Sequence, residues 1–447
     1  MSYATAAASQ ARERTRPSSL AFAASVGAVL IGYLTIELWD LTRYNWLRAY
    51  DAWASSLYVD SIRVHHALPS PSTSDVWHNP PLFYALAALI QPHVGWTGIE
   101  PHQAVQVVSV LSALGVVVLT FLIARELFPS SRWIQIGALV AAATTPVLAR
   151  SSVMYHPEPL ATVLATGGVF VAVRAAQRGW TSRLGGGAAL LLGLADLTRT
   201  WALAEGVAVA AIVGLVCLRT RDRDAVRFLA TFAAVFVVVS APWYVRQEIR
   251  YGNPVAFSKP DPYQWLPSGR PASFFTTLDV NDVFSNPYQP TYANVILPVV
   301  YTDWWGDYSR YFHVPQAETD TPAALPSKYR APLVLQSVVG ILPTLMALVG
   351  AIGLAVVAAR RRSVSVCIAV AAGALVLVSF VGFLVHYPKR DGDNIKALYI
   401  LDVVPLFALA AAWSLEWVHR HASRLVLGTV LAWLAATLAY DVSFLIL

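Results

Sequence analysis

Charge, cysteine and lysine are scarce in this sequence. Of its 447 residues, 13% are charged, two are cysteines and four are lysines. Cys217 and Cys367 both lie in apolar segments, so we expect neither a disulfide framework nor a thiolate metal site. The basic residues form short clusters between apolar segments instead of one continuous stripe, which argues against binding to nucleic acid. The chain also lacks a glycine-rich phosphate loop, so it offers no evident site for ATP.

Hydrophobic residues are abundant and come in long blocks. They make up 56% of the chain, and a block of about 20 apolar residues is long enough to cross a bilayer as a helix. The sequence therefore predicts an all-α polytopic membrane protein. We expect eleven transmembrane helices, at about residues 20–38, 103–127, 133–152, 159–177, 184–198, 201–218, 227–245, 331–358, 363–385, 397–418 and 423–444.

The arginine clusters predict how these spans are oriented. Residues 80–95 form one further apolar stretch, but about 15 residues are too few to cross a bilayer, so we expect a short helix in the outer interface. Every arginine cluster then falls on the cytoplasmic side, as the positive-inside rule requires. The clusters are at residues 125/132, 174/178/183, 219/221/223/227, 360/361/362 and 420/424. This predicts a multi-pass plasma (inner) membrane protein with a cytoplasmic N-terminus; the excess of arginine over lysine suggests a bacterial source.

Two outer segments are long enough to carry a site. The segment 39–102 belongs to an N-terminal membrane module of residues 1–245, and the large outer loop 246–330 follows the seventh span. Residues 331–447 then supply the C-terminal membrane helices. Since the cytoplasmic loops are short, we expect the chemistry on the extracytoplasmic face. The glycines at 185–187 open a span and predict close helix packing.

A dense run of charge, Lys389 to Tyr399, separates two of the late spans. Lys389 and Lys396 are two of only four lysines, and they would lie beside the membrane surface. Such residues hold helix ends at the headgroup level or bind an anion. Because Lys396 begins the next helix, we favour it as a ligand of an anionic group such as a lipid-linked phosphate.

The first outer segment contains an acidic residue, Asp51, at the start of a predicted amphipathic helix. Its carboxylate would either cap that helix or act as a base. Further on, His78 precedes two prolines that begin the short interfacial helix. His78 would be either an anchor at the headgroup level or a phosphate ligand.

Five motifs together resemble the GT-C glycosyltransferases, in the clan of the protein O-mannosyltransferases and the lipid A aminoarabinose transferases. They are Asp51 followed by His-Asn-Pro-Pro-Leu (78–82), Tyr-His-Pro-Glu-Pro (155–159), Gly-Leu-Ala-Asp-Leu-Thr-Arg (193–199), Pro-Trp-Tyr-Val-Arg (242–246) with Tyr-Gly-Asn-Pro (251–254), and Lys396 with Tyr399. They cover about residues 20–410. Three positions depart from the family pattern: Ala52 replaces a frequent glutamate, Ser55 a frequent histidine, and Asn79 is inserted before the prolines.

The resemblance implies a GT-C fold and a glycosyltransferase. Such enzymes move a sugar from a polyprenyl-phosphate donor to an acceptor hydroxyl of a glycan, lipid or protein, with inversion. Asp51 is the expected general base, and Glu158 would orient the acceptor or share the proton. Cations and hydrogen-bond donors would stabilise the departing phosphate: Lys396, Tyr399, Arg246, His78 and Arg199. Arg199 is the weakest of these because Asp196, three residues earlier, could neutralise it.

The second outer segment is rich in aromatic and acidic residues. Trp304, Trp305, Asp303 and Asp307 are the expected acceptor-binding residues, although an interfacial aromatic belt would use the same residue types. We expect no cofactor and no metal; if a catalytic divalent metal were used, Asp303 and Asp307 would hold it. His65 and His66 are adjacent and therefore poorly spaced as co-ligands.

Two other classes of protein fit a polytopic chain. A lipid or sugar transporter, or a flippase, would show paired halves or broken helices near the midplane, whereas most polar residues here lie in the outer segments. A non-catalytic membrane scaffold would tolerate neutralisation of Asp51. The sequence does not reveal the sugar, the acceptor or the length of the lipid carrier.

Overall fold

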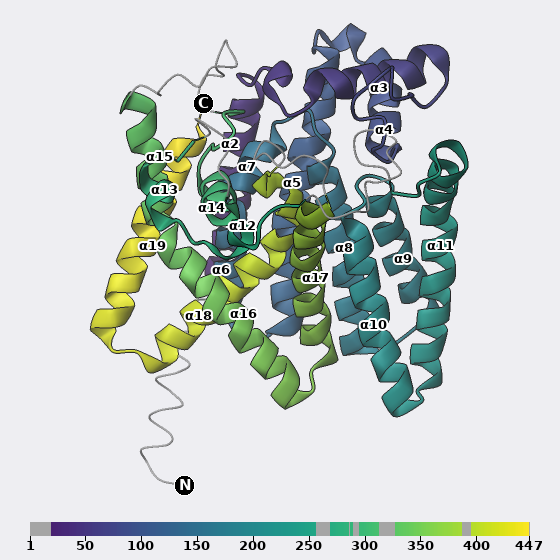
Figure 1. The fold of residues 1–447 in the computed structure, drawn as a ribbon. Coiled ribbons are helices and arrows are strands. Elements are labelled where there is room, and N and C mark those ends of the chain that lie inside the picture. The colour runs from purple at the N-terminus through teal and green to yellow at the C-terminus, as the bar shows by residue number, and fades with distance from the viewer. Residues whose placement is uncertain are drawn as a thin grey trace.

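A computed structural model describes residues 19–255, 269–285, 287–288, 295–312, 327–386 and 395–446. All regular secondary structure in these ranges is helical, as predicted (Figure 1). The principal helices are α2 (Ser19–Leu41), α5 (Pro101–Leu127), α6 (Arg132–Ala143), α7 (Pro146–Ser152), α8 (Glu158–Arg178), α9 (Ser182–Asp196), α10 (Ala202–Thr220), α11 (Arg223–Tyr251), α15 (Ser327–Val339), α16 (Ile341–Arg361), α17 (Val364–His386), α18 (Val404–His421) and α19 (Arg424–Leu445).

Each of the eleven predicted spans corresponds to a helix or a helix pair. Within the described ranges, nine helices are long and apolar enough to cross a membrane, with α15 and α16 forming one of them. The pair α6 and α7 makes a tenth if its 52° bend is taken as a break within one span. The remaining prediction, 184–198, corresponds to α9, which has 15 residues. The chain is therefore a multi-pass membrane protein.

Short helices cover one end of the bundle, here called the α3 end. They are η1 (Trp46–Arg48), α3 (Ala52–His65), α4 (Leu82–Ile90), η2 (Gln91–His93) and η3 (Gly95–Thr97). The predicted amphipathic helix is α3, and the predicted interfacial helix is α4 with η2, which is too short to span a bilayer. Figure 1 shows α3 lying across the tops of the long helices.

Chain direction places every predicted arginine cluster at the end opposite α3. The clusters lie where α5 meets α6, α8 meets α9, α10 meets α11, α16 meets α17 and α18 meets α19, and these connections are at the lower end in Figure 1. The clustering on one face is thus a property of the fold. It is the arrangement that the positive-inside rule associates with the cytoplasm.

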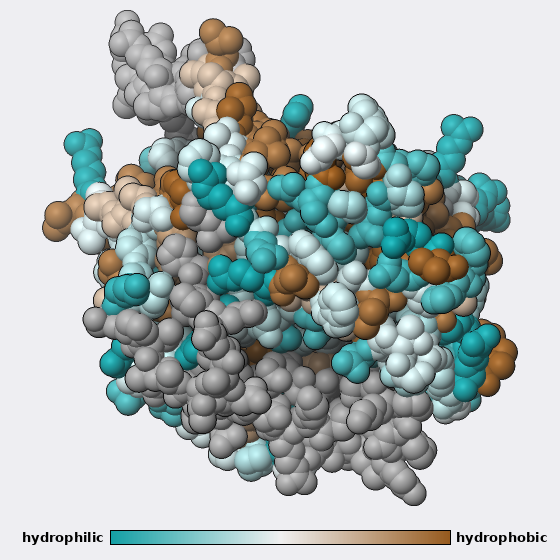
Figure 2. Space-filling view, turned by 90° about the horizontal axis from the view of Figure 1, so that it is seen from above, coloured by the Kyte–Doolittle hydropathy of each residue, from teal (hydrophilic) through white to brown (hydrophobic). Residues whose placement is uncertain are grey.

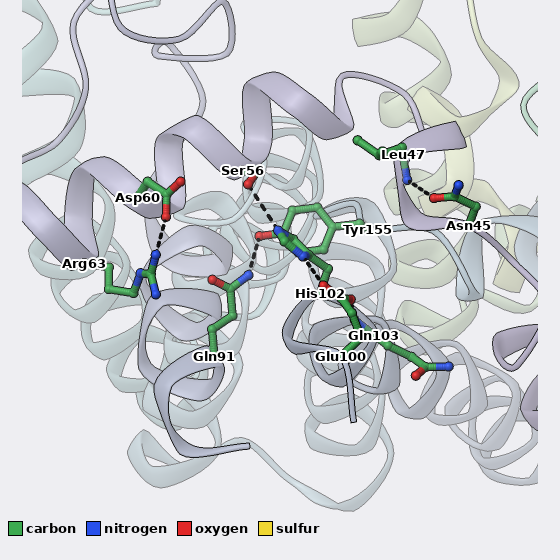
Figure 3. A network of polar contacts seen from close by, with 10 residues as sticks. All are labelled: Asn45, Leu47, Ser56, Asp60, Arg63, Gln91, Glu100, His102, Gln103 and Tyr155. Carbon is green, nitrogen blue, oxygen red and sulfur yellow. Dashed lines mark hydrogen bonds and ion pairs between the residues drawn. The ribbon is translucent and has the colours of Figure 1, made fainter. Parts of the chain in front are cut away.

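A polar network fastens α3 to the start of α5 (Figure 3). The Nε2 atom of His102 lies 3.2 Å from the Ser56 hydroxyl, and its Nδ1 atom lies 2.5 Å from the Glu100 carboxylate. The same imidazole stacks on Trp46, with 3.7 Å between ring centroids. One face and both nitrogens of this ring are therefore used in packing, which fixes the position of α3 relative to the bundle.

The large loop after α11 folds back onto the bundle. Its described helices are α12 (Ala272–Thr276), α13 (Val280–Ser285) and α14 (Ile296–Trp305). Helix α14 packs against α7, α15 and the 3-10 helix η5 (Ala397–Val403). Its aromatic residues consequently belong to the core and not to an exposed belt.

Small residues allow the closest helix contacts. A Cβ atom at Gly185 would lie 2.5 Å from the Phe228 carbonyl oxygen, so the predicted close packing occurs between α9 and α11. Where α16 crosses α18, a Cβ atom at Gly350 would lie 1.9 Å from the Ala410 carbonyl oxygen. Side chains at either position would force these helices apart.

The sides of the bundle and the α3 end differ in the hydropathy of their exposed residues. Large apolar side chains such as Ile31, Val238, Ile249 and Ile352 are exposed along the flanks of the long helices, as expected for contact with lipid. Figure 2 looks onto the α3 end and shows hydrophilic residues over much of the described part of this face, with single hydrophobic residues among them.

The orientation predicts which end an impermeant reagent can reach. A cysteine placed at Thr277, which is exposed beyond α12, should react with an impermeant maleimide in intact cells, whereas one at Asp224, exposed at the start of α11, should react only after permeabilisation. The measurement needs a background with Cys217 and Cys367 replaced by alanine. The reverse labelling pattern would put the α3 end in the cytoplasm.

Candidate active site

Asp51 lies at the α3 end, in the N-cap position of α3, but its side chain does not cap the helix. The backbone is left-handed, with φ 50° and ψ 23°, and the carboxylate accepts no capping hydrogen bond. Aspartate is one of the few residues that adopt this conformation readily. The capping hypothesis is therefore wrong, and the residue is accessible to solvent.

Four basic side chains from different segments surround the Asp51 carboxylate. Desolvation by neighbouring atoms raises the pKa of Asp51, but the charges of Lys396, His156 and Arg199 outweigh it and hold this pKa below its ordinary value. His78, the smallest of the four influences, is neutral at physiological pH. The fold thus brings together residues from the first outer segment, the starts of α8 and α10, and η5. At neutral pH the Asp51 carboxylate is ionised.

Aromatic rings and a backbone anchor hold Lys396 in place. Its Nζ atom lies 4.2 Å from the centroid of the Tyr50 ring and 5.6 Å from that of Tyr311, and only 7% of the residue is exposed. The next residue, Ala397, donates its N–H to Oδ2 of Asp303 over 2.8 Å. Asp303 therefore fixes the start of η5 and, with it, the position of the lysine.

Glu158 is engaged by two neighbours and is only 2% exposed. Arg199 donates from Nε to Oε1 of Glu158 over 2.6 Å, and His156 contacts the other oxygen through Nδ1. Arg199 also donates from Nη1 to Oδ1 of Asn79 over 2.6 Å. Asp196, expected to neutralise Arg199, instead accepts a hydrogen bond of 2.7 Å from Tyr244, so that expectation is wrong.

His78 belongs to the surroundings of Asp51, whereas Arg246, on α11, lies near Tyr58, whose hydroxyl donates to the Asn79 carbonyl oxygen. Burial and the charge of Arg199 lower the pKa of His78 to about 3, so its imidazole is neutral at physiological pH. Arg246 lies 5.4 Å over the Trp243 ring, and its Nη1 atom is buried without a hydrogen-bond partner among the described residues. A buried guanidinium nitrogen of this kind is suited to an incoming anion.

Tyr399 lines the same region through its ring. It packs against Trp201 and Phe383, with centroid distances of 5.8 and 5.7 Å, and the Arg199 guanidinium lies 5.9 Å from its centroid. Tyr399 therefore joins η5 to the start of α10. The predicted residues Lys389 and Arg390 lie outside the described residues.

The four predicted acceptor-binding residues are all buried. Trp304 and Trp305 pack against Phe407, and the Trp305 indole donates to Thr344 over 2.9 Å. Burial raises the pKa of Asp303. Arg150 donates to the Asp303 carbonyl oxygen and lies 3.6 Å from the Asp307 carboxylate. These contacts give the four residues a structural role beside η5. Their direct contact with an acceptor stays a prediction.

Asp303 and Asp307 are the predicted ligands if a divalent metal is used. Both carboxylates lie beside Arg150, and Asp307 also accepts the Tyr311 N–H over 3.0 Å. In the part of the chain that the structure describes, no group of three or more His, Cys, Asp or Glu residues is placed to hold a metal ion.

The structure adds four residues that the sequence does not indicate. Asn79 is an insertion relative to the family pattern, yet it accepts a hydrogen bond from Arg199 and donates from Nδ2 to the Tyr84 hydroxyl over 2.9 Å. His156 belongs to one of the five motifs, and it contacts Glu158 and influences Asp51. Arg150 and Tyr50 belong to none of the motifs. An arginine within a predicted span was the one available signal for Arg150.

Solved structures with a similar fold are known, although no protein-family model and no curated protein matches the sequence. ArnT from Cupriavidus metallidurans bound to undecaprenyl phosphate superposes with a TM-score of 0.51 at 14% identity, over 94% of this chain and 64% of that one. The apo form of an oligosaccharyltransferase from Archaeoglobus fulgidus gives a TM-score of 0.56 at 13% identity, over 96% of this chain and 56% of that one.

These matches span almost all of this chain but under two thirds of either relative. The likeness extends over the helical bundle and the short helices at its α3 end. The fold expected from the five sequence motifs is thereby confirmed: this chain has the GT-C fold.

Proposed function

We propose that this protein is a membrane glycosyltransferase that moves a sugar from a polyprenyl-phosphate donor to an acceptor hydroxyl at the α3 end, with inversion. The observation that carries the proposal is the Asp51 carboxylate, uncapped and exposed, with Lys396, His156, Arg199 and His78 around it. ArnT, which shares the fold, binds undecaprenyl phosphate. That supports a lipid-linked phosphate as the anion in this site.

Asp51 is the proposed general base. An inverting transfer needs a base on the acceptor side and positive charge near the leaving phosphate. The left-handed backbone at Asp51 turns the carboxylate away from the end of α3 and leaves it available to an acceptor hydroxyl. A phosphate leaves without being protonated, so one base is sufficient.

Lys396, with Arg246 and Tyr399, is proposed to bind the donor phosphate. Lys396 supplies charge from a largely buried position, and Arg246 supplies a guanidinium nitrogen with no partner in the described structure. His78, being neutral, contributes a hydrogen bond instead of charge. Arg199 and Glu158 form a buried ion pair. This pair is proposed to position His156 and Asn79 near Asp51.

The direct test is transfer of a radiolabelled sugar by purified protein from a panel of polyprenyl-phosphate sugars. Product formation from one donor, absent in the Asp51→Asn variant, supports the proposal. A protein that binds such lipids but transfers no sugar from any of them, across hydroxyl acceptors of glycan, lipid and peptide type, would contradict it and favour a transporter.

Lys396→Ala should raise the KM for the lipid donor by about 10–100-fold, because a charge-assisted hydrogen bond contributes about 1.5–3 kcal/mol. Removing this charge also lets the pKa of Asp51 rise, so the acidic limb of the pH profile of kcat/KM should move to higher pH. The measurement is donor titration at several pH values. Lys396→Arg should restore only part of the affinity, since a planar guanidinium does not fit the position of an ammonium between two rings.

Lys328→Ala is the matched control. Lys328 is exposed at the start of α15, where its ammonium lies 4.8 Å over the Tyr329 ring. Its removal should leave the donor KM and the pH profile unchanged. If wild type, Lys396→Ala and Lys396→Arg gave superimposable donor curves, Lys396 would be only a membrane anchor.

A further inference from the structure

A small cavity lies inside the bundle, separate from the groups around Asp51. It has a volume of about 20 Å³ and lies between α8, α10, α17 and the junction of η5 with α18. A buried water molecule needs at least about 10–15 Å³, so the cavity has room for one particle of that size. Its polar wall consists of Thr166, Glu205 and Asp402, and the rest is apolar.

Two polar atoms in this wall are unsatisfied. Oε2 of Glu205 and Oγ1 of Thr166 are buried and have no hydrogen-bond partner among the described residues, and these residues are only 2% and 1% exposed. Asp402 accepts a hydrogen bond from the Thr162 hydroxyl, one turn before Thr166 on α8. A carboxylate and a hydroxyl left unpaired in an apolar environment are costly, and a ligand that contacts both would remove the cost.

The backbone beside the cavity is interrupted. Ile400 leaves helical geometry, with φ −113° and ψ 24°, and the 3-10 helix η5 there gives way to α18, whose second residue is Pro405. Within a membrane, irregular backbone is tolerated where it is buried in protein or lines a polar cavity. Discontinuous helices with acidic residues are also the usual setting of small-cation sites in membrane proteins.

We propose that this cavity is a binding site for one Na⁺ ion, held by Glu205, Asp402 and Thr166. All the available ligands are oxygen atoms, which suits a hard cation. The cavity admits one dehydrated ion, whereas a magnesium ion would keep several waters that do not fit. The ion also reduces the repulsion between two carboxylates that line the same small cavity.

Protonation of Glu205 is the alternative to a bound ion, because its hydroxyl hydrogen could be accepted by the Thr166 hydroxyl oxygen. The two cases differ in their response to salt. A single ion in contact with all three groups would make the stability depend on sodium, whereas a protonated Glu205 would not. The site lies close enough to the catalytic region for the charges of Glu158 and Arg199 to reach Asp402, but its existence does not depend on the proposed transfer activity.

The experiment is thermal unfolding of the purified full chain, followed by tryptophan fluorescence, in NaCl, KCl and choline chloride at equal ionic strength. Sodium should raise the Tm in a concentration-dependent way, by about 1–2 °C for each tenfold increase above Kd. Potassium and choline should not. Glu205→Gln and Asp402→Asn, which preserve side-chain size, should lose the sodium effect.

Two further variants keep the test decisive if a carboxylate variant fails to fold. Thr166→Val removes one ligand oxygen with little change in shape and should weaken the sodium response. Glu37→Gln, a buried acid of α2 that contacts Ser152 away from the cavity, should retain it. The same Tm in all three salts for wild type, or an undiminished sodium effect in Glu205→Gln, would overturn the proposal and indicate a cavity filled by water.

Discussion

Replacing Asp51 by asparagine should lower the rate of sugar transfer by about 10²–10⁴-fold, the usual loss when a general base is removed. The amide has the shape of the carboxylate, so substrate positions are preserved while the proton acceptor is lost. Asparagine also adopts the left-handed backbone found at this position as readily as aspartate. The variant should therefore fold normally.

The measurement is single-turnover transfer with matched amounts of purified wild type and variant. Donor binding should be nearly unchanged, because the phosphate contacts come from other residues, and the loss should appear in the chemical step. Asp60→Asn is a suitable control, since Asp60 lies on the same helix and pairs only with exposed Arg63 at 2.8 Å. Transfer by Asp51→Asn within about twofold of wild type would remove Asp51 from the role of base.

Glu158→Gln should destabilise the protein by about 3–5 kcal/mol, because it leaves the charge of Arg199 buried without its carboxylate. The two side chains are 3% and 12% exposed, so water compensates little. The same carboxylate also holds His156. Loss of this contact should disturb the surroundings of Asp51 as well, and activity should fall together with stability.

Thermal unfolding in detergent measures the first effect, and a paired substitution identifies its cause. Adding Arg199→Gln to Glu158→Gln removes the uncompensated charge and should recover part of the lost stability. Asp224→Asn, which breaks an exposed pair with Arg227, should change stability by less than about 0.5 kcal/mol. A stable but inactive Glu158→Gln variant would instead favour direct participation of Glu158 in catalysis.

The length of apolar blocks was sufficient to predict the bundle. Each predicted span has a helical counterpart, since about 20 apolar residues have few alternatives in a membrane. The predicted interfacial helix at residues 80–95 was likewise recognisable from its length. What length could not predict was the bend between α6 and α7, or the return of α14 into the bundle.

The candidate site was accessible mainly through family resemblance. Physical reasoning selected Asp51 and Lys396 separately, and only the resemblance suggested that residues so far apart in the chain belong to one site. The bond between Asn79 and Arg199 joins residues 120 positions apart, and no local pattern indicates such a contact. Asn79 departs from the family pattern and is nevertheless part of the hydrogen-bonded framework of the candidate site.

Composition is ambiguous where one residue type serves two purposes. Trp304 and Trp305 are predicted to bind a sugar because aromatic faces often hold sugars, and in the structure both rings pack against Phe407. Their packing role is established, and contact with a sugar stays a prediction. Two acids inside predicted spans, Glu205 and Asp402, are not among the predicted site residues. An ionisable residue within a span is itself a signal of function, so the sequence contains a reason to select both.

The left-handed backbone at Asp51 limits which acid can serve in this position. A glutamate would carry the same charge, but most residues with a longer side chain pay about 1–2 kcal/mol to adopt that conformation. Its carboxylate would also extend one methylene further among four basic groups. The backbone thus restricts the residue at this turn independently of any reaction, so the proposed general base would be selected both for its conformation and for its chemistry.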